Sequence, residues 1–140
     1  IRYRDLNAKG QATGTTATIT ADMMGKGSRS DQNLRPPGWK GDGRKHNEAR
    51  GHLLGNQLGG SGETMQNLVT QTQNPSNNSW MRPFENQAAR RVRSGEIIEY
   101  HATPFYNDGV LPPESIFLTA LGLHGGLTAR LVKNPAGQRK

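Results

Sequence analysis

The sequence has no cysteine, few aromatic residues and a low apolar content. Without cysteine, disulfides, thiolate metal sites and a cysteine nucleophile are excluded. Phe, Tyr and Trp make up 6% of the 140 residues, and 31% of the residues are hydrophobic. No run approaches the roughly 20 apolar residues of a membrane span, so we expect no membrane partner. These features predict one small, loop-rich domain over residues 1–140.

The charge balance points to a polyanionic partner. The chain carries 18 Lys and Arg against 11 Asp and Glu, a net charge of +7, so nucleic acid is the first partner to consider. Seven cations and three acids lie between Lys26 and Arg50. This stretch is either a solvated connector or the basic rim of a nucleic-acid groove. Trp39 within it is typical of a packed loop anchor more than of a base-stacking platform.

Local patterns predict strands around one helix. Phe84, Ala88 and Val92 recur at helical spacing within residues 82–93, and Pro83 suits a first helical turn. Segment 25–47 is rich in Gly, Pro and charge and should be irregular. The β-branched or alternating segments are 15–21, 96–106, 115–123 and 126–134. We therefore expect an α+β fold with an antiparallel sheet.

Residues suited to phosphodiester hydrolysis cluster in the middle of the chain. His52 follows Arg50 and Gly51 in a polar stretch and titrates near neutrality, as a general base must. Asn and Glu oxygens further on suit Mg²⁺, which keeps most of its waters. Asn74, Asn77 and Asn78 compete for the role of metal ligand. No CxxC or HxxxH spacing supports a zinc hydrolase.

Three motifs carry a family resemblance. ARGHLLGNQLGG, followed by NLVTQTQNPSNN and FENQ, resembles the DNA/RNA non-specific endonucleases of the ββα-metal (His-Me finger) superfamily. The resemblance is densest from Arg35 to Pro104. It implies a central antiparallel sheet with a ββα-metal finger carrying the active site. On this basis residues 1–49 supply an N-terminal strand and basic loop, 50–94 the active-site region, and 95–140 the C-terminal strands.

The resemblance also implies roles for individual residues. His52 corresponds to the general base, and Asn77, 25 residues later, to the single protein ligand of Mg²⁺, with Mn²⁺ as a substitute. Glu85, eight residues further on, corresponds to the residue that supports the metal's waters. Arg50 and Asn67 complete the implied catalytic set, Asn67 as a support near the base. The implied products carry 5′-phosphate ends.

Two positions depart from the family pattern. The usual D-R-G-H has Ala49 in place of its acid, with Glu48 beside it, and the phosphate-clamping arginine four residues after the Glu is replaced by Ala89. We expect these two changes to alter the cleavage rate more than to abolish catalysis, because the implied general base and metal ligand are retained. The side chains expected to contact phosphate instead are Arg90, Arg91, Arg93 and Lys45.

The sequence therefore predicts a Mg²⁺-dependent endonuclease that cuts DNA and RNA without sequence preference. The alternative is a non-catalytic nucleic-acid-binding module of the same fold. The chain begins at Ile1, which fits a mature secreted protein or a toxin domain cut from a longer chain. An immunity protein would be a partner in the toxin case. The other histidines, His46, His101 and His124, are expected to be structural or exposed.

Overall fold

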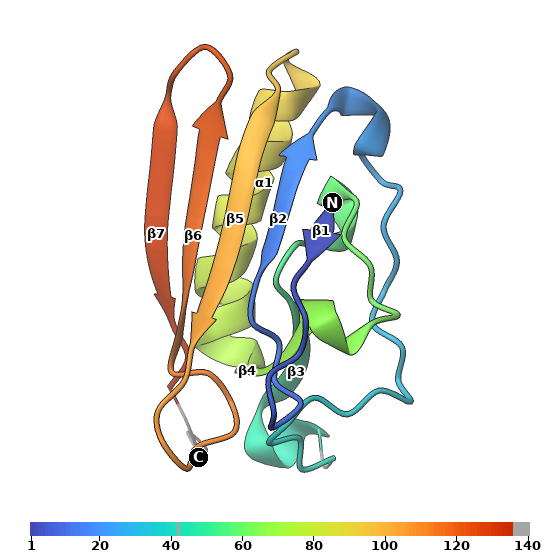
Figure 1. The fold of residues 1–140 in the computed structure, drawn as a ribbon, viewed down its shortest axis with the longest axis vertical. Coiled ribbons are helices and arrows are strands. Elements are labelled where there is room, and N and C mark those ends of the chain that lie inside the picture. Colours follow the sequence, from blue (N-terminus) through green and yellow to red (C-terminus); the bar gives the residue numbers. More distant parts are fainter. Residues whose placement is uncertain (42, 136–140) are drawn as a thin grey trace.

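In the part of the chain that the structure describes, a five-stranded antiparallel sheet, a separate two-stranded sheet and one α-helix form the framework of the fold (Figure 1). The computed structural model describes residues 1–41 and 43–135; Asp42 of the expected basic loop and residues 136–140 of the expected C-terminal region lie outside the described residues. The large sheet has the order β1-β2-β5-β6-β7. Its strands are β1 (Arg2–Tyr3), β2 (Thr15–Ile19), β5 (Ile98–Phe105), β6 (Ser115–Gly122) and β7 (Leu127–Lys133). The predicted α+β class with an antiparallel sheet is confirmed.

Alternation along the strands decides which face of the large sheet is buried. In β5, Ile98, Tyr100 and Ala102 are buried, whereas the alternate residues His101 and Thr103 are exposed. β6 pairs with β5 so that Leu118 lies opposite Ala102, and it alternates in the same way. One face of the sheet is thus a continuous apolar surface, as a period of two residues requires.

The helix α1 (Arg82–Arg93) covers this apolar face, with the bounds that the sequence predicted. Phe84, Ala88 and Val92 are buried at the predicted helical spacing, and Phe84 packs edge-on against Tyr100 at 5.9 Å between ring centroids. In Figure 1, α1 runs behind β5 and β6. Among the described residues, no helix has both the length and the apolar character needed to cross a membrane.

The second sheet forms a ββα unit together with α1. Its strands β3 (Glu48–His52) and β4 (Leu68–Thr72) are antiparallel, with His52 opposite Leu68. A π-type helical segment, Gln73–Met81, connects β4 to α1. Periodicity did not reveal β4, because its five residues are all buried and three of them are polar. β1 and the π-type segment were also missed.

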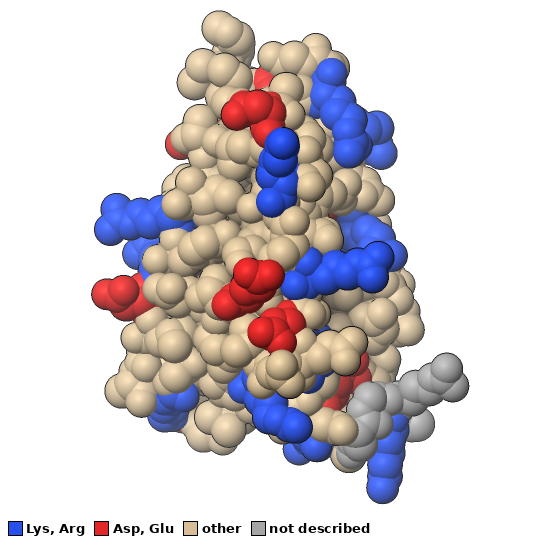
Figure 2. Space-filling model, turned by 90° about the vertical axis from the view of Figure 1, so that its right-hand side faces the viewer, with Lys and Arg blue, Asp and Glu red and all other residues tan. Residues whose placement is uncertain are grey.

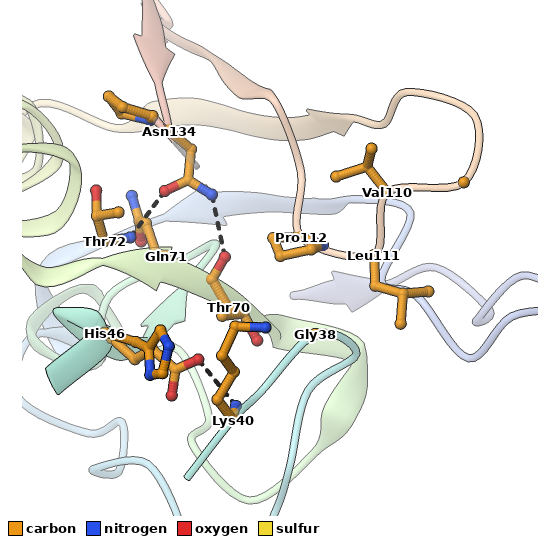
Figure 3. Close-up of a pocket in the computed structure, with 13 residues that line it drawn as sticks. Gly38, Lys40, His46, Thr70, Gln71, Thr72, Val110, Leu111, Pro112 and Asn134 are labelled. Atoms are coloured by element: carbon orange, nitrogen blue, oxygen red, sulfur yellow. Dashed lines mark hydrogen bonds between the residues drawn. The ribbon is translucent and has the colours of Figure 1, made fainter. Parts of the chain in front are cut away.

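A buried asparagine fixes the small sheet to the end of the large one. Asn134, directly after β7, accepts a hydrogen bond from the backbone N–H of Thr72 at 2.8 Å and donates to the carbonyl oxygen of Thr70 at 3.1 Å (Figure 3). It also donates to the carbonyl of Pro113 at 2.8 Å. Beside it, Val110 and Leu111 face a mainly apolar pocket of about 370 Å³ that holds none of the predicted catalytic residues. Asn134 therefore holds the ββα unit in place.

Candidate active site

A second pocket of about 370 Å³ lies where the end of β3, the turn after it and the start of α1 meet. It brings together four of the residues predicted for the catalytic centre, which are Arg50, His52, Asn77 and Glu85. The other lining residues are Arg29, Ser30, Gly55, Asn56, Gln57, Arg82 and Asn86. Three separate elements thus supply a histidine, an amide and a carboxyl group to one polar pocket.

His52, the last residue of β3, has a fixed tautomer. Its Nε2 lies 2.9 Å from the carbonyl oxygen of Ser28. Because a carbonyl only accepts hydrogen bonds, Nε2 carries the proton, and Nδ1 of the neutral ring keeps its lone pair. Burial lowers the pKa of His52, and the hydrogen bond to Ser28 opposes this only in part. The ring is therefore neutral at pH 7 and able to accept a proton.

Gly51 is required next to the histidine because Gln71 occupies the space that a side chain would need. A Cβ at Gly51 would lie 1.9 Å from Gln71 Oε1, which no real structure allows. Gln71 is buried, and its Nε2 donates to Ser76 Oγ at 2.8 Å. The Gln71 side chain thus links β4, beneath the base, to the π-type segment that carries Asn77.

Asn77 has an amide oxygen that is free to bind a ligand. Its Nδ2 donates to Gln73 Oε1 at 2.9 Å, which orients the amide, and no described residue donates to its Oδ1. The competing asparagines are placed differently: Asn74 Oδ1 accepts a hydrogen bond from Asn78 Nδ2 at 3.1 Å, and neither lines the pocket. Asn78 does not cap α1, whose N-cap is Met81.

Glu85, in the first turn of α1, is held against a glycine. A Cβ at Gly55 would lie 2.7 Å from Glu85 Oε2, so glycine is needed for this approach. Burial raises the pKa of Glu85 to about 8, while Arg82 and a backbone hydrogen bond from Gly55 lower it by less. In the absence of a bound metal ion, the carboxyl group is therefore mostly protonated at pH 7.

The raised pKa of Glu85 makes the stability of the metal-free protein depend on pH. Its folded-state pKa of about 8 exceeds the ordinary 4.5, so its contribution to folding is full below pH 4.5 and is lost as pH rises through 8. Glu85→Gln removes this titration. In EDTA we expect the variant to melt several degrees above the wild type at pH 8.5 and close to it at pH 5, measured by circular dichroism. If the melting temperatures of the two proteins changed in parallel between pH 5 and pH 8.5, the raised pKa of Glu85 would be contradicted.

Asn67 does not line the pocket, and most of its side-chain hydrogen bonds are to backbone groups. It is fully buried, and its Oδ1 accepts from Leu54 N–H and Thr15 Oγ1, both at 3.0 Å. Its Nδ2 donates to the carbonyls of Leu54 and Ser61 at 2.9 Å. The hydrogen bonds of Asn67 therefore tie the chain just after His52 to β2, and its side chain is not among those that line the pocket.

Arg50 anchors the irregular segment that forms one wall of the pocket. Its Nε donates to the carbonyl of Leu34 at 2.7 Å and its Nη2 to that of Gln32 at 2.8 Å. The guanidinium carbon lies 4.2 Å from the centroid of the Trp39 ring, at cation–π distance. Trp39 is thus a packed loop anchor, as its surroundings in the sequence predicted.

The cations predicted to bind phosphate are not all near the pocket. Arg91 is committed elsewhere, because its Nη2 pairs with Glu96 at 2.8 Å and donates to the carbonyl of Gly126 at 2.7 Å. Lys45 is exposed in the turn before β3, at the end of that strand opposite to His52. Arg90 and Arg93 are exposed on α1. Arg91 and Lys45 are therefore not among the residues that line the pocket.

Two arginines at the pocket escaped the sequence reasoning. Arg82 precedes Glu85 by one helical turn, a spacing that could have indicated it. Arg29 carried no such signal, because it lies in an irregular segment.

Ala89 is fully buried, so a phosphate-clamping arginine at that position would not reach the pocket without repacking of the core. Glu48 does not replace the missing acid, since its carboxylate accepts from the N–H groups of Lys40 and Gly41.

Charge on the N-terminal loop side of the molecule is dispersed. Figure 2 shows Lys and Arg side chains separated by acidic and uncharged ones on this face, without one large basic patch. Among the described cations of segment 25–47, Arg29 alone lines the pocket. Segment 25–47 therefore forms one side of the pocket, and it contributes few positive charges to a nucleic-acid groove.

Known proteins resemble this chain in sequence and in fold. A family model described as DNA/RNA non-specific endonuclease matches residues 2–121, whereas no curated protein sequence matches significantly. A Sda1 nuclease solved with a bound zinc ion has a TM-score of 0.80 and 23% identity, over 96% of this chain and 74% of the other. An extracellular endonuclease gives 0.72 and 20%, over 96% and 78%. An extracellular nuclease gives 0.68 and 19%, over 96% and 84%.

The structural likeness establishes the fold, and the family model covers most of the chain, including every residue of the pocket. The motifs around His52, Asn77 and Glu85 therefore belong to the matched region and not to a chance local similarity. This chain belongs to the DNA/RNA non-specific endonuclease family.

Proposed function

We propose that the chain is a divalent-metal-dependent endonuclease that hydrolyses phosphodiester bonds of DNA and RNA, with His52 as its general base. The observation that carries the proposal is one polar pocket that contains a neutral histidine of fixed tautomer, a free amide oxygen and a carboxyl group. Arg29 and Arg82 at the same pocket supply positive charge for the phosphate.

We propose that Nδ1 of His52 is the atom that accepts the proton. Nδ1 takes a proton from a water molecule, whose oxygen attacks phosphorus in line with the 3′ oxygen. The bond from phosphorus to the 3′ oxygen then breaks, and that oxygen takes a proton from a second water molecule, which leaves a 3′ hydroxyl and a 5′-phosphate end. The imidazolium afterwards returns its proton to solvent. The hydrogen bond from Nε2–H to Ser28 keeps the ring oriented throughout and favours the imidazolium that forms.

The donor set of the pocket fits Mg²⁺ or Mn²⁺. Asn77 Oδ1 and the Glu85 carboxyl group are hard oxygen donors, and no group of three or more His, Cys, Asp and Glu residues suited to a metal occurs in the described part of the chain. Asn77 would hold the ion directly and Glu85 its waters. When bound, the ion supplies positive charge against the charge that develops on the phosphate oxygens.

A row of side chains on α1 leads away from the pocket. Arg82 and Asn86 line the pocket, and Arg90 and Arg93 follow on the same helical face at spacings of four and three residues. With a rise of about 1.5 Å per residue, the row extends roughly 16 Å from Arg82 to Arg93. We assign it to successive phosphates, which explains affinity without base recognition.

Removing an arginine of this row should weaken nucleic-acid binding and its salt dependence together. We expect Arg82→Ala and Arg90→Ala, each in a His52→Ala background that prevents cleavage, to lower the slope of log K against log salt by about 1. The measurement is fluorescence anisotropy with labelled DNA and RNA. Arg130→Ala, at an exposed arginine of β7 outside the pocket, is the control and should keep the wild-type slope. Unchanged slopes for both row variants would refute the assignment.

A cleavage assay on supercoiled plasmid and on RNA, with Mg²⁺ or with EDTA, tests the proposed activity. We expect nicking and RNA degradation with the metal and none with EDTA. Nicks that DNA ligase reseals would demonstrate 5′-phosphate and 3′-hydroxyl ends. Binding of both nucleic acids without any cleavage would favour the non-catalytic module instead.

We also propose secretion or delivery as a toxin domain. Two solved proteins of the same fold are described as an extracellular endonuclease and an extracellular nuclease, which supports a role outside the producing cell. Immunoblots of the culture medium and the cells test this directly. An immunity partner is expected only for a toxin, and no observation on the molecule supports one.

A further inference from the structure

One face of the large sheet is uncovered. α1 packs on one side of β5 and β6, and in the described part of the chain nothing packs in front of β5, β6 and β7 (Figure 1). Large apolar side chains nevertheless project from this open face, with 40% to 64% of their surface exposed. They are Phe105, Phe117, Leu121, Leu127 and Leu131, and they are called the outer apolar patch.

The strand register makes this patch continuous. Phe117 of β6 lies opposite Leu131 of β7, and Leu121 lies opposite Leu127. Thr119 and Ala129, which are paired between them, are small. Phe105 of β5 is diagonal to Phe117, because Thr103 is the direct partner of Phe117. The patch exposes on the order of 450 Å² of apolar surface, within the range of the largest patches on monomers, which are often functional.

Charged groups lie at the margin of the patch and not within it. Glu99 of β5 is the direct cross-strand partner of Leu121 on the β2 side of the patch, where it accepts a hydrogen bond from Thr18. Lys133 lies at the far end of β7, opposite Ser115. The five patch residues and the two small residues between them carry no charge. Two copies can therefore bring this face together without opposing like charges at its centre, despite the net charge of +7.

We propose that the outer apolar patch is the interface of a symmetric homodimer in which two sheets pack face to face. A standard interface buries about 800 Å² per partner, of which about 56–65% is apolar, or roughly 450–520 Å². The exposed apolar area of the patch matches the apolar area of one side of such an interface. His101, Thr103 and Lys133 lie around the patch and would form its polar rim. Two-fold symmetry requires such a self-complementary surface, and aligned sheet packing is a common solution for apolar sheet faces.

The dimer would leave both active sites accessible. The pocket of His52 and Glu85 lies on the α1 side of the large sheet, whereas the outer apolar patch is on the opposite side. Mutations can therefore affect dimerisation and catalysis separately. If the proposed dimer is not found, the proposed endonuclease activity is unaffected, and the reverse also holds.

Sedimentation velocity of the whole chain between about 1 and 100 μM tests the dimer. We expect the wild type to reach twice its mass of 15.3 kDa, and the Leu127→Glu, Leu131→Glu double variant to stay monomeric, with an apparent Kd at least about 100-fold higher, equivalent to ~2.7 kcal/mol. Leu111→Glu, at a leucine with similar exposure (43%) outside the patch, is the matched control and should dimerise. Both variants should be folded, as shown by circular dichroism, and their plasmid cleavage per chain should match that of the wild type. The melting temperature of the double variant should fall only as far as loss of the dimer requires.

Two results would overturn the proposal. A wild-type chain that stays at 15.3 kDa over the whole range shows that copies do not pair, and that the patch serves another partner or none. A double variant that is folded and dimerises like the wild type places the interface elsewhere. Loss of dimer in the double variant together with an intact dimer in Leu111→Glu supports it.

Discussion

His52→Ala should slow plasmid cleavage by a factor on the order of 10² to 10⁴, the usual span for loss of a general base. The structure gives the physical reason: Ser28 holds the proton on Nε2, and burial lowers the pKa of His52, so that Nδ1 is a free acceptor at neutral pH. The Nε2 hydrogen bond links the ring to an irregular segment, so the variant must be shown to be folded. Initial rates at saturating Mg²⁺ and a thermal melt provide both measurements.

A control and a rescue separate chemistry from structure. His124→Ala removes an exposed histidine in the turn between β6 and β7 and should cleave at the wild-type rate. Added imidazole should restore part of the activity of His52→Ala, because it can enter the vacated space and accept the proton. Near-normal cleavage by a folded His52→Ala protein would remove His52 from the role of base.

Asn77→Ala should reduce cleavage by more than about 100-fold, even at high Mg²⁺. Removing groups that merely orient metal ligands already slows catalysis about 10- to 100-fold, and Asn77 is the one of the three candidate asparagines that lines the pocket. Nucleic-acid binding should stay close to the wild type, because phosphate contacts come from arginines. Cleavage titrated with Mg²⁺ and anisotropy on the same protein separate the two effects.

The neighbouring asparagines provide matched controls. Asn74→Ala and Asn78→Ala remove side chains of the same type within three residues, and these two bond to each other outside the pocket. Both variants should retain most of the activity. A dead Asn78→Ala beside an active Asn77→Ala would show that the amide was wrongly chosen, and three active variants would place the metal site elsewhere.

The sequence alone determined the elements whose pattern is periodic. The bounds of α1 followed from Phe84, Ala88 and Val92 at helical spacing with Pro83 in the first turn, and β5 and β6 followed from alternation. Periodicity records which face is buried, so it is informative where one face meets solvent. Periodicity could not predict β4, because this strand is buried on both faces and contains the polar residues Thr70, Gln71 and Thr72.

The sequence also determined which residue types meet at the pocket, through motif spacing and a family resemblance. Only the tertiary structure decided how they act, because hydrogen bonds between distant segments fix orientation and protonation. Ser28, 24 residues from His52, sets the tautomer of the ring, and Gly55, 30 residues from Glu85, leaves room for the carboxyl group. Likewise, Arg91 bonds to Glu96 and Gly126 and does not line the pocket, although its place in the sequence had suggested a phosphate contact. A linear pattern specifies neighbours along the chain, whereas packing specifies burial and partners, on which pKa and reactivity depend.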